Sequence, residues 1–215
     1  MKYKYIYFDL DGTIIDSSEG VVNSALYALK KFNMDKYSID TIKQTLIGPP
    51  LFEGLKKLIG CTDENILNDM VRVFRNDYSS YGVFQNNLFK DIKNMLDILY
   101  NLGSRMEILT SKPEKFAKQI IKQHNLEKYF ININGAGELD KKSSKSCKLG
   151  ISTVKNKELS IMIGDRTEDI IAGQDNGVDT IAVTYGFDNI KLLKNQKPTY
   201  IIDNVMDIID IIKGK

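Results

Sequence analysis

The sequence predicts an α/β protein in which a doubly wound, parallel, Rossmann-like sheet carries a small all-α domain inserted after its first strand. Within residues 3–8 the apolar and aromatic side chains are Tyr3, Tyr5, Ile6, Tyr7 and Phe8, which gives apolar character on both faces, as in a strand that is covered on both sides of a parallel sheet. From residue 89 onward, short apolar strands alternate with helical segments long enough to serve as crossover connections. The residues between, from about 17 to 82, show only helical periodicity. We therefore expect a core domain of residues 1–15 and 85–215 and a helical domain of residues 16–84.

The first strand ends in two acidic residues, within the run YKYIYFDLDGTIID that begins at Tyr3. Asp9 and Asp11 follow the apolar residues, and Gly12 allows the chain to turn sharply after them. Carboxylates at the end of a buried strand are unfavourable unless positive charge meets them. The same edge of a parallel sheet is where α/β folds bind ligands. The alternative is a simple surface turn, because Asp-Gly is a common turn dipeptide.

The inserted segment divides into helices by the spacing of its apolar residues. We predict helices at residues 18–32, 39–46, 51–60 and 63–81. Ser17 and Ser18 are suited to cap the first of them. The run Ile47-Gly48-Pro49-Pro50 ends the second, because proline cannot continue a helix.

The remaining chain alternates between strand and helix. We predict strands at residues 105–109, 130–134, 160–163, 179–183 and 199–202, and helices at 91–102, 114–125, 169–176 and 205–212. Right-handed crossovers place the carboxyl end of every strand at one edge of the sheet. Asp9, Thr110 and Asp165 each follow such a strand, so we expect these three side chains to converge.

Composition narrows the class of protein. The chain has 215 residues, of which 42% are hydrophobic. Its formal net charge is only +2, so its charge gives no general argument for a nucleic-acid partner. The two cysteines are far apart in sequence, so we expect no zinc site and a reducing, cytoplasmic location. The first residues lack the apolar run of a signal peptide, and no run of 18 apolar residues predicts a membrane helix.

Two further motifs carry groups suited to phosphate and metal binding. Thr110 and Ser111 offer hydroxyl and main-chain N–H groups that are able to cradle phosphate oxygens, although a Thr-Ser pair before proline is by itself more typical of a helix start. Asp165 and Asp169 are four residues apart at the opening of a helix and face the same side. Such oxygen ligands suit Mg²⁺. The alternative is that these acids only favour the helix N-terminus through its dipole.

The run FDLDGT resembles the first motif of the haloacid dehalogenase-like (HAD) hydrolases, in particular their phosphatase branch, because dehalogenases lack the second aspartate. The later motifs follow in the family's order, so the resemblance covers the whole chain. It implies a nucleophile at Asp9, a general acid/base at Asp11 and a phosphate-binding hydroxyl at Thr110. The phosphate-binding set that it implies is Asp9, Leu10, Asp11, Thr110, Ser111 and Lys145.

The third motif of the family requires a lysine that neutralises the nucleophile and the phosphate. Lys145 begins an amphipathic stretch and precedes Asp165 by 20 residues, a spacing like that of the family. Lys141 and Lys142 are the other candidates, with Lys142 the main alternative, and the alternative for each of the three is an ordinary solvated lysine. The resemblance implies a Mg²⁺ site formed by Asp9, the main-chain carbonyl of Asp11, and Asp165. The supporting residues are Gly12, Thr13, Gly164 and Asp169.

The nearest resemblance is to phosphoglycolate phosphatases and 5′-nucleotidase-like proteins, because of Gly48-Pro49-Pro50-Leu51 and Val183-Thr184-Tyr185-Gly186-Phe187. It implies a type-1 helical cap that closes over the site and contacts the substrate through Gly48, Pro49 and Leu51. The expected activity is Mg²⁺-dependent hydrolysis of a small phosphorylated metabolite through an aspartyl-phosphate, with no nucleic-acid polymer or membrane as partner. The alternatives are a sugar phosphomutase and a non-enzymatic phosphate-binding protein.

Overall fold

The core of the protein is a parallel sheet of six strands in the order β5-β4-β1-β6-β7-β8. The computed structural model describes residues 1–47, 50–137, 144–153 and 156–215. The sheet confirms the predicted fold class, and each of its pairings is parallel. Its strands are β1 (Tyr5–Phe8), β4 (Arg105–Pro113), β5 (Phe130–Ala136), β6 (Ser160–Gly164), β7 (Asp179–Val183) and β8 (Tyr200–Ile202).

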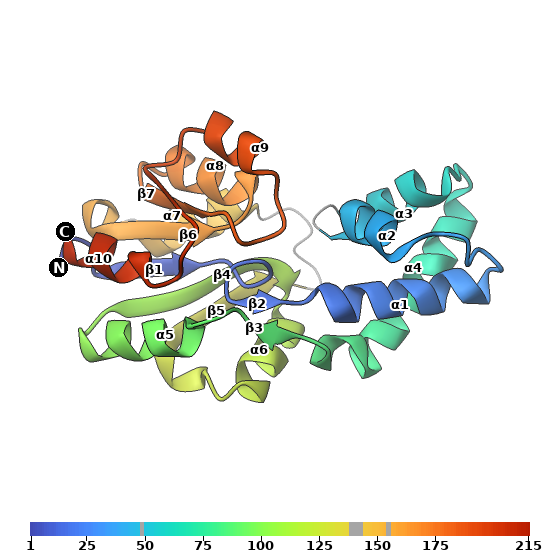
Figure 1. Ribbon diagram of the computed structural model, residues 1–215, viewed down its shortest axis with the longest axis horizontal. Coiled ribbons are helices and arrows are strands. Elements are labelled where there is room, and N and C mark those ends of the chain that lie inside the picture. The colour runs from blue at the N-terminus through green and yellow to red at the C-terminus, as the bar shows by residue number, and fades with distance from the viewer. Residues whose placement is uncertain (48–49, 138–143, 154–155) are drawn as a thin grey trace. The chain divides into compact units, whose positions relative to one another are not determined.

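Helices cover both faces of this sheet (Figure 1). They are α5 (Ile92–Asn101), α6 (Glu114–Gln123), α7 (Lys145–Thr153), α8 (Thr167–Asp175), α9 (Ile190–Asn195) and α10 (Asp207–Lys213). Leu149 of α7 and Ala172 of α8 pack on one face against Tyr7, Leu109 and Met162, and all five are buried. The helices α5 and α6 lie on the opposite face. The central strands β1 and β6 are buried along nearly their whole length, as expected when helices cover both faces of a sheet.

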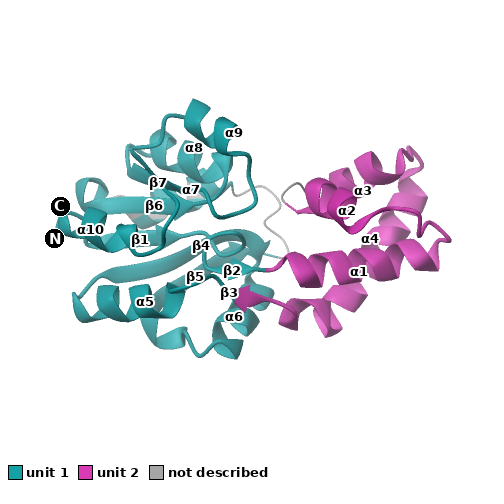
Figure 2. Cartoon of the chain, in the orientation of Figure 1, with its two compact units in different colours: residues 1–16, 88–215 teal, residues 17–87 magenta. Residues whose placement is uncertain are grey.

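The chain separates into two compact units, residues 1–16 with 88–215 and residues 17–87 (Figure 2). The sequence-based domain borders fall after residues 15 and 84. The second unit contains α1 (Ser18–Lys31), α2 (Ile39–Leu46), α3 (Leu51–Ile59) and α4 (Glu64–Ser80). Two short strands, β2 (Ile15–Asp16) and β3 (Asn87–Leu88), pair where the chain passes from one unit to the other.

The ends of the inserted helices follow from local hydrogen bonds. Ser38 accepts from the N–H of Thr41 at the start of α2, and Asp63 accepts from two N–H groups at the start of α4. Ser17 occupies the N-cap position of α1, as predicted, but its side chain makes no capping hydrogen bond. The positions of Gly48 and Pro49 lie outside the described residues.

Several details differ from the sequence-based expectation. The strand β4 continues to Pro113, four residues beyond its predicted end, with a shift of register after Leu109. The helix α9 was not predicted. His124 follows α6, where the helix dipole favours a cation, but burial lowers the pKa of its imidazole. Among the described residues, no helix has the length and apolar character needed to cross a membrane.

Candidate active site

The loop after β1 holds Asp9 and Asp11 at the carboxyl edge of the sheet. The N–H of Asp9 donates to the carbonyl of Ile163 on β6 at 2.9 Å, so Asp9 extends the β1–β6 ladder by one residue. The carbonyl of Leu10 then accepts from the N–H groups of residues 13, 14 and 15. This turn requires Gly12, whose φ is +83°. The sequence therefore buries Asp9, 4% exposed, while Asp11 keeps partial access to solvent.

Three buried carboxylates meet at this edge. Asp9, Asp165 and Asp169 each contribute an oxygen, and the three oxygens lie within 4.8 Å of one another. Two glycines make this approach possible. A Cβ atom on Gly12 would lie 2.1 Å from Oδ2 of Asp165, and one on Gly164 would lie 2.1 Å from Oδ2 of Asp169. Glycine at these two positions is therefore a steric requirement of the cluster.

Lys145 brings a positive charge to these carboxylates. Its Nζ lies 3.1 Å from Oδ1 of Asp9 and forms an ion pair with Asp169. The side chain is only 6% exposed. Burial opposes its charge, yet the carboxylates of Asp169 and Asp9 raise its pKa above the ordinary value. Lys142, the alternative, lies outside the described residues.

The cluster has more negative than positive charge. Among the described residues, three carboxylates meet the ammonium of Lys145, which leaves a formal excess of two negative charges for these four groups. Burial and the charge of Asp9 raise the pKa of Asp165 to about 7. Burial also raises the pKa of Asp169 to about 8, against the opposing effect of Lys145. A further cation would relieve this repulsion.

One atom of the cluster is suited to such a cation. Among the described residues, Oδ1 of Asp9 is buried without a hydrogen-bond partner, although it is at ion-pair distance from Lys145. A buried carboxylate oxygen without a donor is unfavourable. The donor set is entirely oxygen, which matches the preference of Mg²⁺. The residues present therefore fit a divalent metal ion at Asp9 and Asp165.

The second motif contributes groups from the extended end of β4. Thr110 is 3% exposed, and its hydroxyl accepts from the N–H of Lys112 at 3.1 Å. Because the hydroxyl oxygen accepts there, its own proton stays available for another acceptor. Ser111 is exposed. Thr13 donates from its hydroxyl to Oδ1 of Asp165 at 3.4 Å, which connects the first loop to the fourth motif.

The structure adds residues that sequence reasoning did not assign to the site. Lys112 forms an ion pair with Asp11, at 2.7 Å. The N–H of Phe187 donates to Oδ2 of Asp165 at 2.8 Å, and the hydroxyl of Tyr185 donates to the carbonyl of Thr13 at 3.1 Å. Lys112 directly follows the predicted Thr110-Ser111 pair, and this position in the sequence was the signal that could have indicated a place for Lys112 in the site. A main-chain donor such as that of Phe187 has no sequence signal.

Of the three residues predicted to contact the substrate from the cap, the structure describes only Leu51. Leu51 is the first residue of α3 in the second unit and is partly buried, while Gly48 and Pro49 lie outside the described residues.

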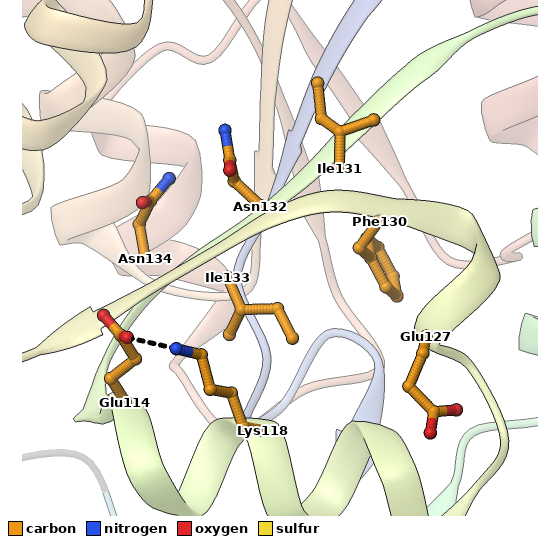
Figure 3. A pocket seen from close by; sticks show the side chains of 8 residues that line it. All are labelled: Glu114, Lys118, Glu127, Phe130, Ile131, Asn132, Ile133 and Asn134. Carbon is orange, nitrogen blue, oxygen red and sulfur yellow. Dashed lines mark hydrogen bonds and ion pairs between the residues drawn. The ribbon is translucent and has the colours of Figure 1, made fainter.

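A hollow of about 420 Å³ lies between α6 and the edge strand β5 (Figure 3). Glu114 and Lys118 line its floor and pair with each other. No residue of the carboxylate cluster lines it, so we do not assign the reaction to it.

The comparisons with known proteins agree with this arrangement. A family model described as haloacid dehalogenase-like hydrolase matches residues 6–183. A 5′-nucleotidase from Pseudomonas aeruginosa is 31% identical over 204 residues, covering 93% of this chain and 91% of the relative. A phosphoglycolate phosphatase from Vibrio parahaemolyticus is 26% identical over 220 residues, covering 97% and 96%.

A solved structure shows the same fold. The crystal structure of a predicted phosphatase from Clostridium acetobutylicum superposes with a TM-score of 0.87 at 32% identity, covering 100% of both chains. The match of the family model extends from the first strand to the end of β7 and includes every residue of the carboxylate cluster. The chain therefore belongs to the haloacid dehalogenase-like hydrolases and is an enzyme of their phosphatase branch.

Proposed function

We propose that this enzyme hydrolyses a small phosphate monoester through an aspartyl-phosphate on Asp9. The observation that supports this most directly is the position of the Asp9 carboxylate. It is buried at the carboxyl edge of the sheet, and its Oδ1 lies 3.1 Å from Nζ of Lys145 while accepting no hydrogen bond from the described residues. Such a carboxylate oxygen beside a cation is poised to attack a phosphoryl group, which itself brings negative charge to that cation.

In the first step of the proposed reaction, an oxygen of Asp9 attacks phosphorus and the bond from phosphorus to the ester oxygen breaks. Asp11 gives a proton to the departing alkoxide, so that an alcohol leaves. Lys145 neutralises the transferring group from one side. The hydroxyl of Thr110 donates to a phosphoryl oxygen, because its own oxygen is already engaged by the N–H of Lys112. The N–H groups of residues 10, 11 and 111 are the proposed main-chain donors.

In the second step, water attacks the phosphorus of the aspartyl-phosphate, and Asp11 takes the proton that the water loses. The bond between phosphorus and Asp9 breaks, which releases inorganic phosphate and restores the Asp9 carboxylate. Both steps use Asp11, first as an acid and then as a base. Because the same carboxyl group serves both steps, it must lie within reach of the phosphoryl group on Asp9, and a position two residues after Asp9 provides this.

We propose Mg²⁺ as the metal ion, held by carboxylate oxygens of Asp9 and Asp165 and by the main-chain carbonyl of Asp11, with Asp169 in support. When bound, it would supply positive charge to the phosphoryl oxygens. Asp169 is engaged with Lys145 and receives the N–H of Arg166 at 3.1 Å. We therefore assign Asp169 the role of orienting Lys145.

The substrate class that we propose is a small phosphorylated metabolite. The relatives named 5′-nucleotidase and phosphoglycolate phosphatase support this size of substrate. The assignment of residues 16–84 as a cap, with Gly48, Pro49 and Leu51 contacting the leaving group, remains a prediction from the sequence. We retain the cytoplasmic location on the same basis.

The test of this proposal is release of inorganic phosphate from a panel of phosphorylated metabolites and aryl phosphates, with and without Mg²⁺. Asp9→Asn keeps the size of the side chain and removes the nucleophile, so turnover should fall by several orders of magnitude. Asp203→Asn, at an exposed position, is the matched control and should retain normal turnover. Near-normal phosphate release from folded Asp9→Asn protein would exclude the covalent mechanism. Transfer of phosphate to a sugar, with little release to water, would favour a phosphomutase.

A further inference from the structure

The side chain of Asp11 is held by a lysine that the proposed mechanism does not use. Nζ of Lys112 donates to both carboxylate oxygens of Asp11, at 2.7 and 3.0 Å. The lysine side chain is 8% exposed and the aspartate side chain 26%. Contact with both oxygens fixes the rotation of the carboxylate plane as well as its position. This is a more specific arrangement than a surface ion pair, in which one contact forms and breaks freely.

The backbone of β4 explains why Lys112 turns inward. The regular pairing of β4 with β5 ends at Leu109, and the register has shifted when pairing resumes at Pro113. Such irregularities redirect side chains and are common next to active sites. Ser111 and Pro113 on either side are exposed, whereas Lys112 is largely buried. The N–H of Lys112 is also fixed, because it donates to the hydroxyl of Thr110.

The two buried lysines of the site serve different acids. Lys145 lies between Asp9 and Asp169, where it neutralises the proposed nucleophile. Lys112 contacts Asp11 instead. Since burying an ammonium is unfavourable without a fixed partner, the inward direction of Lys112 needs a reason other than neutralising Asp9. Asp11, the carboxylate for which we propose the acid/base role, is a partner that contacts this ammonium through both of its oxygens.

We propose that Lys112 is a positioning residue for Asp11, and that its contact with both oxygens fixes the direction of this carboxyl group toward the leaving group and the attacking water. This inference rests on the proposed function and adds a residue to it. Lys112 keeps its protons throughout, and Asp11 alone exchanges one. Without Lys112, Asp11 would rotate among side-chain conformers, and only some of them would point toward the reacting atoms. Both steps that depend on Asp11 would then slow.

A different role for Lys112 would give a different result. If its ammonium bound an anionic group of the substrate directly, its loss would weaken substrate binding whether or not Asp11 was present. A double-mutant cycle separates the two roles, because residues that act through each other are not additive. The cycle combines Lys112→Met, which keeps most of the length of the side chain and removes its charge, with Asp11→Asn.

The experiment measures kcat and KM for an alkyl phosphate, together with the burst of phenol from an aryl phosphate. We expect Lys112→Met to lower kcat on the alkyl phosphate by about tenfold, less than the roughly 10²–10⁴-fold expected for losing the acid/base itself. In the Asp11→Asn background, the same substitution should change kcat by less than about twofold. The phenol burst should persist, because an acidic leaving group needs little proton transfer.

Two further variants complete the test. Lys112→Arg should recover most of the lost kcat, since a guanidinium is able to contact both carboxylate oxygens. Lys118→Met is the matched control, because Lys118 forms an exposed ion pair with Glu114 on α6, and it should keep normal kcat. Circular dichroism and thermal melting verify the fold of each variant, and Lys112→Gln replaces Lys112→Met if the latter does not fold.

The outcomes distinguish this inference from the proposed function. Additive losses in the double variant, or a change confined to KM, would overturn the positioning role while leaving an active phosphatase. Loss of the phenol burst together with a lower melting temperature would also overturn it, because it would show a merely structural role. Absence of Asp9-dependent phosphate release from the wild-type enzyme would instead overturn the proposed function, and the inference with it.

Discussion

Asp165 accepts a hydrogen bond from the main-chain N–H of Phe187, with 2.8 Å between the nitrogen and Oδ2. This contact ties the end of β6 to the loop that follows β7. The loop approaches closely because residue 186 is glycine. A Cβ atom there would lie 2.2 Å from Cβ of Asp165 and 2.5 Å from the carbonyl oxygen of Gly12. The shape of the carboxylate cluster therefore depends on a loop that carries none of its acids.

The first prediction concerns Gly186→Ala. The added methyl group has no space, so we expect a loss of about 1–3 kcal/mol in the free energy of unfolding, with a clear loss of turnover. The measurement is urea unfolding together with phosphate release. Gly103→Ala is the control, because Gly103 has a φ of +78° but nothing within 4 Å of an added Cβ. It should cost about 1 kcal/mol and leave turnover intact. Equal effects on turnover would contradict the steric argument.

The second prediction concerns the metal ion. Mg²⁺ should raise the free energy of unfolding of the wild-type protein by about 2.7 kcal/mol at a concentration 100-fold above its dissociation constant, and its melting temperature should rise accordingly. Asp165→Asn removes a proposed ligand and should abolish this stabilisation. Chelation with EDTA should abolish turnover, Mg²⁺ should restore it, and Ca²⁺ should not, because its coordination is larger and looser. Full activity in exhaustively chelated enzyme would refute the metal site.

The third prediction distinguishes an acid/base role of Asp11 from a purely structural role in the turn after β1. Asp11→Asn serves a turn equally well, so a structural role predicts an almost silent change. As an acid/base, its loss should slow turnover of an alkyl phosphate by roughly 10²–10⁴-fold. An aryl phosphate should still form the aspartyl-phosphate, seen as a burst of phenol and a trapped adduct by mass spectrometry. Equal loss on both substrates, with no adduct, would count against this role.

The fourth prediction concerns His124 and the pH dependence of stability. Burial lowers the pKa of this imidazole from its usual 6.5. Below about pH 6.5 the unfolded chain therefore binds the proton more readily than the folded protein, and the contribution of His124 to the free energy of unfolding falls as pH decreases. At higher pH the imidazole is neutral in both states. The raised pKa values of Asp165 and Asp169 act in the opposite direction but are shared by both proteins, so the stability of wild type relative to His124→Gln, measured by urea unfolding, should decrease from pH 7.5 to 5.5. Identical pH profiles would refute this.

The fifth prediction concerns the start of α3. If residues after Pro50 determine substrate preference, Leu51→Ala and Phe52→Ala should change the ranking of natural phosphate esters more than the rate on a small aryl phosphate. Ile59→Ala, a partly buried position at the other end of the same helix, is the control and should leave the ranking unchanged. Parallel changes on all substrates would show that Leu51 and Phe52 have only a structural role.

Much of the fold followed from periodicity, because buried strands and amphipathic helices leave repeating apolar patterns. The convergence of Asp9 and Asp165 followed from topology, since parallel strands with right-handed crossovers end at one edge. The contact between Lys112 and Asp11 could not be predicted, because it depends on a register shift within β4. The helix α9 has six residues, too few to show helical periodicity. The helix dipole would favour the charged form of His124, but burial lowers the pKa of its imidazole, and burial depends on tertiary packing that the local sequence does not show.

The pairing of β2 with β3 also affects how the sheet closes during folding. Strands β1 and β4 pair although Tyr5 and its partner Arg105 lie about 100 residues apart. The residues that flank the inserted helices are hydrogen-bonded neighbours, as the N–H of Phe89 and the carbonyl of Ile14 show at 3.1 Å. Once these ends meet, the loop that remains between β1 and β4 consists of residues 9–14 and 89–104, about 22 residues, which lowers the entropic cost of closing it by about 1 kcal/mol. The insertion thus lengthens the chain by a whole helical unit while adding little to the conformational search of the sheet.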